Sequence, residues 1–127
     1  MEGVAYNGRW ILRTVEGFCN RRMDPIIAVG GGAVSDVWLQ IYADVFDRTI
    51  RQLAEPRLVT LRGAALLGLV GIGRLSFDQI PGLIKITHTY QPNPANRQIY
   101  DELFFEFVDF YKRNKKAFAR LNRRNGV

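Results

Sequence analysis

The sequence contains little cysteine and little histidine. Cys19 is the only cysteine among 127 residues, so an internal disulfide is excluded. It lies on the apolar side of a predicted helix, which favours a buried thiol. His88 is the only histidine, and no suitably spaced partner marks it as catalytic, so we expect it in a loop or at the surface. No set of His, Cys, Asp or Glu has metal-ligand spacing.

Membrane and secretion signals are missing as well. The most apolar stretch, residues 64–73, is about half as long as a bilayer-spanning helix needs to be. Charged residues interrupt residues 1–23, where a secretory signal would need an apolar core. We therefore expect a soluble, cytoplasmic protein that has no membrane partner.

Acidic residues are absent from the C-terminal end of the chain. The net charge is +6, and residues 112–127 alone carry +7, from Lys112, Arg113, Lys115, Lys116, Arg120, Arg123 and Arg124. The rest of the chain is therefore almost neutral, and the high pI is a property of this basic tail. Such a tail can bind nucleic acid by releasing counterions, but a solvated helix end is the more common case. We do not expect a nucleic-acid partner.

Helical periodicity alternates with short apolar runs along the first half of the chain. Apolar residues recur at helical spacing over residues 2–22 and again from residue 34 to residue 45. Ser35 or Asp36 can cap this second helix. Between the two helices, residues 26–29 form a continuous apolar run, which is typical of a strand buried on both faces. Residues 48–53 alternate as a second strand does.

The second half of the chain is predicted to be mainly helical. Residues 60–73 are small and apolar on all sides, which indicates a buried helix. Pro81-Gly82 indicates a turn, and residues 83–90 are a possible extended segment. Asn93 and Pro94 start a last helix whose aromatic stripe we assign to the core: Tyr100, Leu103, Phe104, Phe107, Phe110 and Tyr111. Two clear strands make a poor sheet, which favours a fragment of a larger α/β domain.

Three consecutive glycines, Gly30 to Gly32, join the first strand to the second helix. This layout is that of a ligand site at the carboxyl end of a strand. The dinucleotide fingerprint fails because Ser35 stands where its third glycine belongs, and the P-loop fails because no lysine precedes Lys85. Two interpretations remain. One is a bare backbone that lies against a nucleoside at a helix N-terminus, and the other is a tight turn without a ligand.

Four stretches resemble the C-terminal domain of the FGGY carbohydrate kinases, in the same order and at the same spacing. They are "EGVAYNGRWIL", "GGGAVSDVWLQIYADV", "LRGAALLGLVGIG" and "YQPNPANRQIYDELFFEF". The triple glycine with Ser35, Trp38 and Gln40 is most similar to the xylulokinase branch. The resemblance covers residues 2 to about 113. We assign residues 1–127 to the second half of the nucleotide-binding domain, with residues 112–127 as a basic helical tail.

The resemblance implies a fold, a reaction and a site. The fold is α/β, part of an actin-like, hexokinase-like (ribonuclease H-like) ATPase domain, and it is mostly helical with a few strands. The reaction transfers the γ-phosphate of ATP, with Mg²⁺, to a sugar such as xylulose. By position, Gly31, Gly32 and Ala33 would lie against adenosine, and Asp36, one turn into the helix, would reach the adenine edge. We assign no catalytic residue and no metal ligand to this chain.

The resemblance also implies parts that this sequence does not contain. The family's sugar-binding residues, its general base and its phosphate-binding turns have no counterpart here. We therefore expect the chain to be a fragment without kinase activity of its own, which meets the sugar only through the missing N-terminal domain. It would aggregate, form a homodimer or associate with a complementing kinase fragment. The alternative function is a non-catalytic regulatory module that binds through its basic tail.

Overall fold

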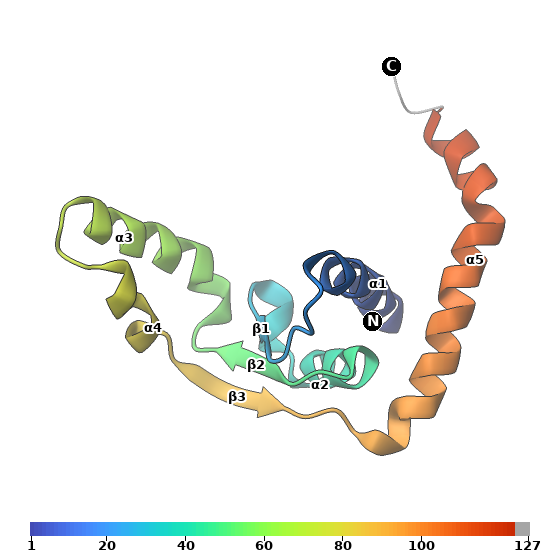
Figure 1. Cartoon of the computed structure of the whole chain (residues 1–127), viewed down its shortest axis with the longest axis horizontal. Coiled ribbons are helices and arrows are strands. Elements are labelled where there is room, and N and C mark those ends of the chain that lie inside the picture. Colours follow the sequence, from blue (N-terminus) through green and yellow to red (C-terminus); the bar gives the residue numbers. More distant parts are fainter. Residues whose placement is uncertain (124–127) are drawn as a thin grey trace.

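The computed structural model describes residues 1–123 (Figure 1). The four residues that end the predicted basic tail lie outside the described residues. Along the chain the elements are α1 (Glu2–Cys19), β1 (Ile26–Ala28), η1 (Gly31–Val34), α2 (Asp36–Phe46), β2 (Ile50–Leu53), η2 (Pro56–Leu58), α3 (Val59–Gly71), η3 (Phe77–Gln79), α4 (Ile80–Leu83), β3 (Ile86–Tyr90), η4 (Pro94–Asn96) and α5 (Arg97–Arg123), where η marks a 3₁₀ turn. The predicted helices and strands are confirmed.

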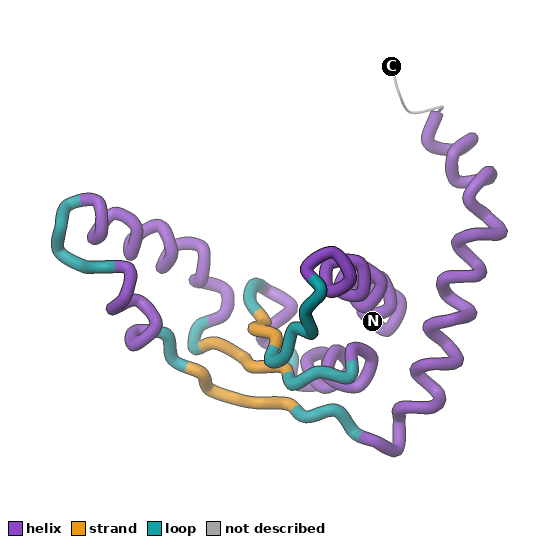
Figure 2. Tube along the Cα trace, viewed as in Figure 1, coloured by secondary structure: helices purple, strands orange, loops and turns teal. Residues whose placement is uncertain are grey.

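The three strands form one small sheet in the order β1-β2-β3 (Figure 2). β1 and β2 are parallel, with Ile26 opposite Ile50, and α2 connects them. β2 and β3 are antiparallel, with Ile50 opposite Tyr90. The extended segment predicted over residues 83–90 is therefore a third strand, so the expectation of a two-stranded sheet was wrong. β3 returns along β2 because the arm formed by α3 and α4 reverses the chain.

The core consists of two clusters that share α2. In the first, Ala5 and Tyr6 of α1 meet Val45 of α2 and Phe104 of α5. In the second, Leu39 and Ala43 of α2 pack with Ala33 and Ile50. α2 therefore contacts the sheet with one face and the helix pair α1 and α5 with another.

A buried carboxylate fixes the start of α5 to α2. Asp44 is only 5% exposed, and it accepts hydrogen bonds from the backbone N–H of Asn93 (2.8 Å), from Asn96 Nδ2 (2.8 Å) and from Gln40 Nε2 (2.8 Å). Asn93 in turn caps the following turn by accepting from the N–H of Ala95, as its position before Pro94 predicted. The route from β3 into α5 is therefore held by polar contacts.

α3 is a helix, as predicted, but the prediction that it is buried was wrong. It has no buried residue, and Leu61 and Leu67 are 68% and 59% exposed. It packs on η2 and extends with α4 away from α1, α2 and α5 (Figure 1). Within residues 1–123 nothing covers its outer face, so its apolar composition by itself does not bury it. Pro81-Gly82 lies inside α4 and not in a turn.

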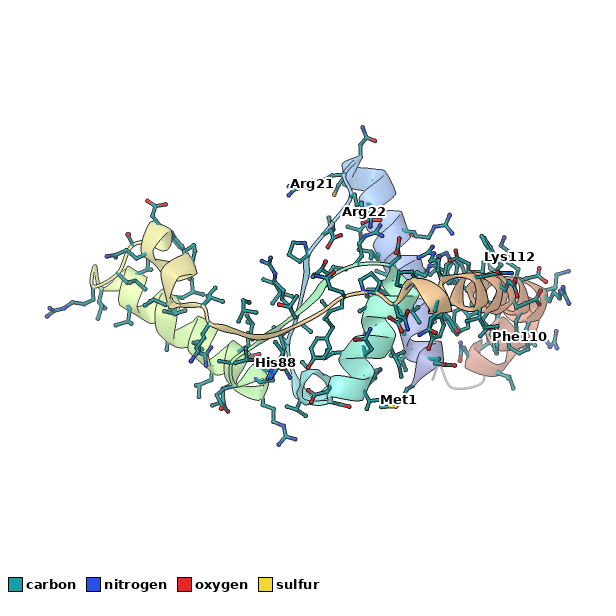
Figure 3. The ribbon with its side chains drawn as sticks, turned by 90° about the horizontal axis from the view of Figure 1, so that it is seen from below. Met1, Arg21, Arg22, His88, Phe110 and Lys112 are labelled. Atoms are coloured by element: carbon teal, nitrogen blue, oxygen red, sulfur yellow. The ribbon has the colours of Figure 1, made fainter. Side chains whose placement is uncertain are left out.

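Three other burial predictions also differ from the structure. β1 is not buried on both faces, since Ile27 is 50% exposed. Cys19 is exposed, because the last turn of α1 extends past the first cluster. Of the aromatic stripe on α5 only Phe104 is buried, and Phe110 is 62% exposed. α5 continues well beyond the body of the molecule, and Phe110 and Lys112 lie on opposite sides of it, away from the sheet (Figures 1 and 3).

A partly buried ion pair joins the end of α1 to the end of α2. The Arg48 guanidinium contacts Glu16 at 2.8 Å, and their side chains are 11% and 14% exposed. Arg48 also donates to the carbonyl oxygens of Phe46 and Asp47, which end α2. Burial by itself would raise the pKa of Glu16, but the N–H of Met23 and the Arg48 guanidinium together bring it below its ordinary value. Asp101 shows the same balance, with burial opposed by Arg9 and Arg97.

We predict that acid weakens the fold through these carboxylates. A carboxyl whose pKa is lower in the folded protein than in the unfolded chain stabilises the fold at every pH above its pKa in the unfolded chain, which is about 4.3 for Glu. This stabilisation is lost as the pH falls from there through the pKa of the carboxyl in the folded protein. Glu16→Gln should lower the free energy of unfolding at pH 7 by about 3 kcal/mol, because Arg48 loses its counter-charge, and should flatten the decline below about pH 4.5. Urea unfolding followed by circular dichroism measures both effects. Glu106→Gln, at an exposed position on α5, should change neither, and an unchanged acid profile in Glu16→Gln would contradict the assignment.

Candidate functional site

The glycine turn leaves β1 and leads into α2 through η1. The N–H of Gly30 donates to the carbonyl of Pro56 (2.8 Å), which ties the end of β1 to the segment after β2. Ser35 is the N-cap of α2, and its Oγ accepts from the N–H of Trp38 (3.3 Å). Of the two caps considered in the sequence, the structure uses Ser35.

Two of the three glycines are required by the fold, each for a different reason. Gly30 has φ +89°, a conformation that residues with a side chain rarely adopt. A Cβ on Gly32 would lie 2.8 Å from Cζ3 of Trp38, so the indole ring occupies the space that a side chain would need. Gly31 has neither restriction, because no other described atom lies within 4 Å of its Cβ position. Gly31 is exposed, so its bare backbone is open towards solvent.

Ala33 is enclosed by its own sheet. It is 3% exposed, and its carbonyl accepts from Nε2 of Gln52 on β2 (2.6 Å). Oε1 of Gln52 lies 2.8 Å from Nδ1 of His88 on β3. A chain of polar contacts therefore connects β3 through β2 to the glycine turn. His88 is exposed, as predicted, but it belongs to a strand and not to a loop (Figure 3).

Asp36 is the first residue of α2, and not one turn into the helix as expected. Its Oδ1 accepts a hydrogen bond from the Tyr90 hydroxyl (2.7 Å), which holds the carboxylate over the end of β3. Burial, and then the contact with Asp36, raise the pKa of Tyr90 to about 12, so the phenol stays protonated and remains a donor. The sequence did not indicate Gln52 or Tyr90, because both reach the site from strands that are distant along the chain.

An apolar groove lies next to the turn, between β1 and α2. It has a volume of about 420 Å³, and its walls include Ile27 and Val29 on one side and Trp38, Tyr42 and Phe46 on the other. Of the four predicted site residues, Gly32 and Ala33 line this groove, whereas Gly31 and Asp36 do not. The indole of Trp38 lies against Gly32 and lines the groove with it, whereas the carboxylate of Asp36 is bonded to Tyr90 on β3.

The chemistry of the turn limits which ligands it suits. An open glycine backbone and an oriented carboxylate suit a flat ring that carries an amino group. Within residues 1–123, no cluster of three His, Cys, Asp or Glu is placed to hold a cation. None of the helices in that range combines the length and apolarity needed to cross a bilayer.

Strand, glycine turn and capped helix are elements of an α/β domain. Residues 1–72, more than half of the chain, match the C-terminal domain of the FGGY family of carbohydrate kinases. The chain belongs to this family, and its fold is part of the family's actin-like ATPase fold. The resemblance to this family is thereby confirmed.

The relatives are enzymes much longer than this chain. The chain is 28% identical over 123 residues to a xylulose kinase of Staphylococcus epidermidis and 29% identical over 122 residues to a gluconokinase of Bacillus licheniformis. In both cases the match covers 95% of this chain and 24% of the relative. The crystal structure of xylulose kinase from Rhodospirillum rubrum superposes with a TM-score of 0.72 at 28% identity, covering 93% of this chain and 24% of that one. The chain thus spans about a quarter of the length of these relatives.

We predict that valine at one of two adjacent glycines destabilises the fold, whereas valine at the other leaves it almost unchanged. Gly32→Val forces the indole of Trp38 away and should lower the free energy of unfolding by about 2 kcal/mol, a fall of several degrees in Tm. Gly31→Val meets open space and should stay within about 0.5 kcal/mol of the parent. Thermal melts of the two variants measure the difference. Equal destabilisation would show that the turn is packed differently from the structure described here.

Proposed function

We propose that this chain is the adenosine-holding part of an FGGY kinase's nucleotide-binding domain. The observations that carry the proposal are the open backbone at Gly31 and, at the start of the helix that follows, the carboxylate of Asp36, which Tyr90 orients. Of the two interpretations that the glycine run left open, the proposal adopts the first, in which the bare backbone lies against a nucleoside. It is supported by the family to which the chain belongs.

The four residues take different roles in this proposal. The backbone of Gly31 and Gly32 lies against the nucleoside, and Ala33 supports the turn from behind through its contact with Gln52. Asp36 accepts a hydrogen bond from the amino group of the adenine ring. Its negative charge repels phosphate, so the base lies near α2 and the phosphates extend away from it. The Mg²⁺ of the reaction would be held by these phosphates, because the described residues offer no metal cluster.

The parent reaction would be phosphoryl transfer from ATP to a sugar or a related polyol. Relatives named xylulose kinase, gluconokinase and ribulokinase all match this chain, so the acceptor is not distinguished by this quarter of the protein. Phosphoryl transfer depends on groups that position and neutralise the phosphates, and no such set occurs in the described residues. We therefore propose that the chain binds nucleotide but is not a kinase without a complementing portion.

Isothermal titration of the purified chain with ATP, ADP and xylulose tests this function. We predict that ATP and ADP bind with similar affinity, since the γ-phosphate is not contacted, and that xylulose does not bind. Asp36→Ala should weaken both nucleotides about tenfold, through loss of one hydrogen bond to a charged group. Gly31→Val should weaken them further by covering the open backbone.

Asp78→Ala is the matched control, since Asp78 is an exposed acid on η3, far along the arm. It should leave the affinity unchanged. Absence of nucleotide binding by the parent chain, or equal binding by Gly31→Val, would contradict the proposal. Melts of each variant recorded in parallel separate a loss of binding from a loss of folding.

A further inference from the structure

A hollow rich in arginine lies between α1, the end of α2 and the start of α5, and its volume is about 390 Å³. Five arginines line it: Arg9, Arg13, Arg22, Arg48 and Arg97. Three acids share the lining: Glu16, Asp47 and Asp101. The lining therefore has two more positive than negative charges. This surplus matches the charge of a phosphate group, which is close to −2 at pH 7.

Two of the arginines are buried and already paired. Arg9 binds Asp101 and donates to the carbonyl oxygen of Tyr100 (3.3 Å), and its side chain is only 8% exposed. Arg48 binds Glu16, as described above. These two pairs fix the walls of the hollow and leave no net charge between them. The surplus therefore belongs to the other three arginines, which share a single further acid.

That acid, Asp47, does not saturate them. Its Oδ2 lies 3.4 Å from Nη1 of Arg97 and 3.8 Å from Nη2 of Arg22, both beyond the usual range of an N–H···O hydrogen bond. Nη1 of Arg97 is buried, yet it has no hydrogen-bond partner within residues 1–123. Arg13 lines the hollow with an exposed side chain. Guanidinium donors around this space are therefore available to a ligand.

The hollow lies at the opposite end of the sheet from the glycine turn. Arg22 and Arg48 precede β1 and β2, whereas the turn follows β1. These strands are parallel, so their amino ends lie together. The 11 residues of α2, about 16 Å, separate Asp36 at the turn from Asp47 at the hollow. The hollow is therefore a second site, and its arginines are not placed to neutralise the phosphates of a nucleotide held at the turn.

We propose that this hollow, the arginine pocket, binds a phosphate group, either as the free ion or on a small phosphorylated metabolite. Planar guanidinium groups donate paired N–H bonds to phosphate oxygens, and Arg22 and Arg97 would supply these bonds. Leu12, Phe46 and Phe105 complete the lining, and the volume is sufficient for the carbon skeleton of a small metabolite.

A bound phosphate would connect three segments of the chain. Arg13 belongs to α1, Arg22 to the connection before β1, and Arg97 to the start of α5. The three are brought together only in the folded chain, so a phosphate that binds there stabilises the fold by mass action. The pocket is thus a site through which an anion can act on the packing of α1, α2 and α5 without contact with the nucleotide site.

Isothermal titration of the full chain with inorganic phosphate tests the proposal, with chloride used to keep the ionic strength constant. One phosphate should bind per chain, and Tm should rise with its concentration. Arg22→Gln should weaken phosphate about tenfold or more, through loss of charge-assisted hydrogen bonds. Arg13→Gln should weaken it in the same direction. Both side chains are exposed, so the melts of these variants without phosphate should match that of the parent.

Arg21→Gln is the matched control. Arg21 is the exposed neighbour of Arg22 and does not line the pocket, and Figure 3 labels both residues near the end of α1. The substitution removes the same charge from the same segment and should leave the affinity for phosphate unchanged. An equal loss in Arg21→Gln and Arg22→Gln would show that only the net charge of the chain attracts the ion, and would overturn the proposal.

A second titration, with xylulose 5-phosphate, distinguishes the two sources of the phosphate group. Tighter binding than that of inorganic phosphate, again weakened in Arg22→Gln, assigns the pocket to a phosphorylated metabolite. Equal or weaker binding assigns it to the free ion. If neither compound binds, or if Arg22→Gln and Arg13→Gln bind as the parent does, the proposal is wrong.

Adenosine separates this proposal from the proposed function, because it carries no phosphate and can occupy only the glycine turn. Asp36→Ala should weaken adenosine and leave phosphate unchanged, and Arg22→Gln should do the reverse. A chain that binds phosphate but not adenosine retains the arginine pocket and loses the nucleotide site, and the opposite result retains only the nucleotide site. Competition between adenosine and phosphate would show a single site and overturn the proposal.

Discussion

The burial of α2 between two clusters is the constraint on which the rest of the structure depends. Ala43 and Val45 are both completely buried, one against the sheet and the other against α1 and α5. Asp44 lies between them and holds the entry to α5 with hydrogen bonds. Three successive residues of α2 therefore contact the sheet, the helix pair α1 and α5, and the segment that leads from β3 into α5. A short helix of 11 residues acts in this way only because nearly every side is in contact.

The glycine turn depends on the same helix. Ser35 starts α2 and Trp38, one turn later, lies over Gly32. The packing of Trp38 explains why residue 32 is a glycine without reference to any ligand. The space next to Gly31 stays open. The three glycines therefore differ in what they do. Gly30 provides a positive φ, Gly31 leaves the backbone exposed, and Gly32 leaves space for the indole of Trp38. This division is what separates effects on binding from effects on folding at adjacent positions.

The exposure of apolar residues is consistent with the greater length of the chain's relatives in the FGGY family. The matched relatives are about four times as long, and the apolar residues exposed on α3 and β1 are those that have no covering segment among residues 1–123. The ion pair of Glu16 with Arg48 and the Phe104 cluster keep α1, α2 and α5 together without that segment. The arm of α3 and α4 has no comparable support.

The sequence by itself determined the elements, the glycine turn and the family. Helical spacing, the Asn93-Pro94 start and the four motifs are local patterns, and local patterns persist in a fragment. It did not determine burial, because apolar composition does not show which residues are covered by packing. In the part of the chain that the structure describes, α3, Ile27 of β1 and Phe110 of α5 remain exposed. Only the tertiary structure decided that Trp38 fills the space at Gly32, that Gln52 supports Ala33 and that Tyr90 orients Asp36. These contacts join residues on separate elements, and spacing along the chain carries no information about them.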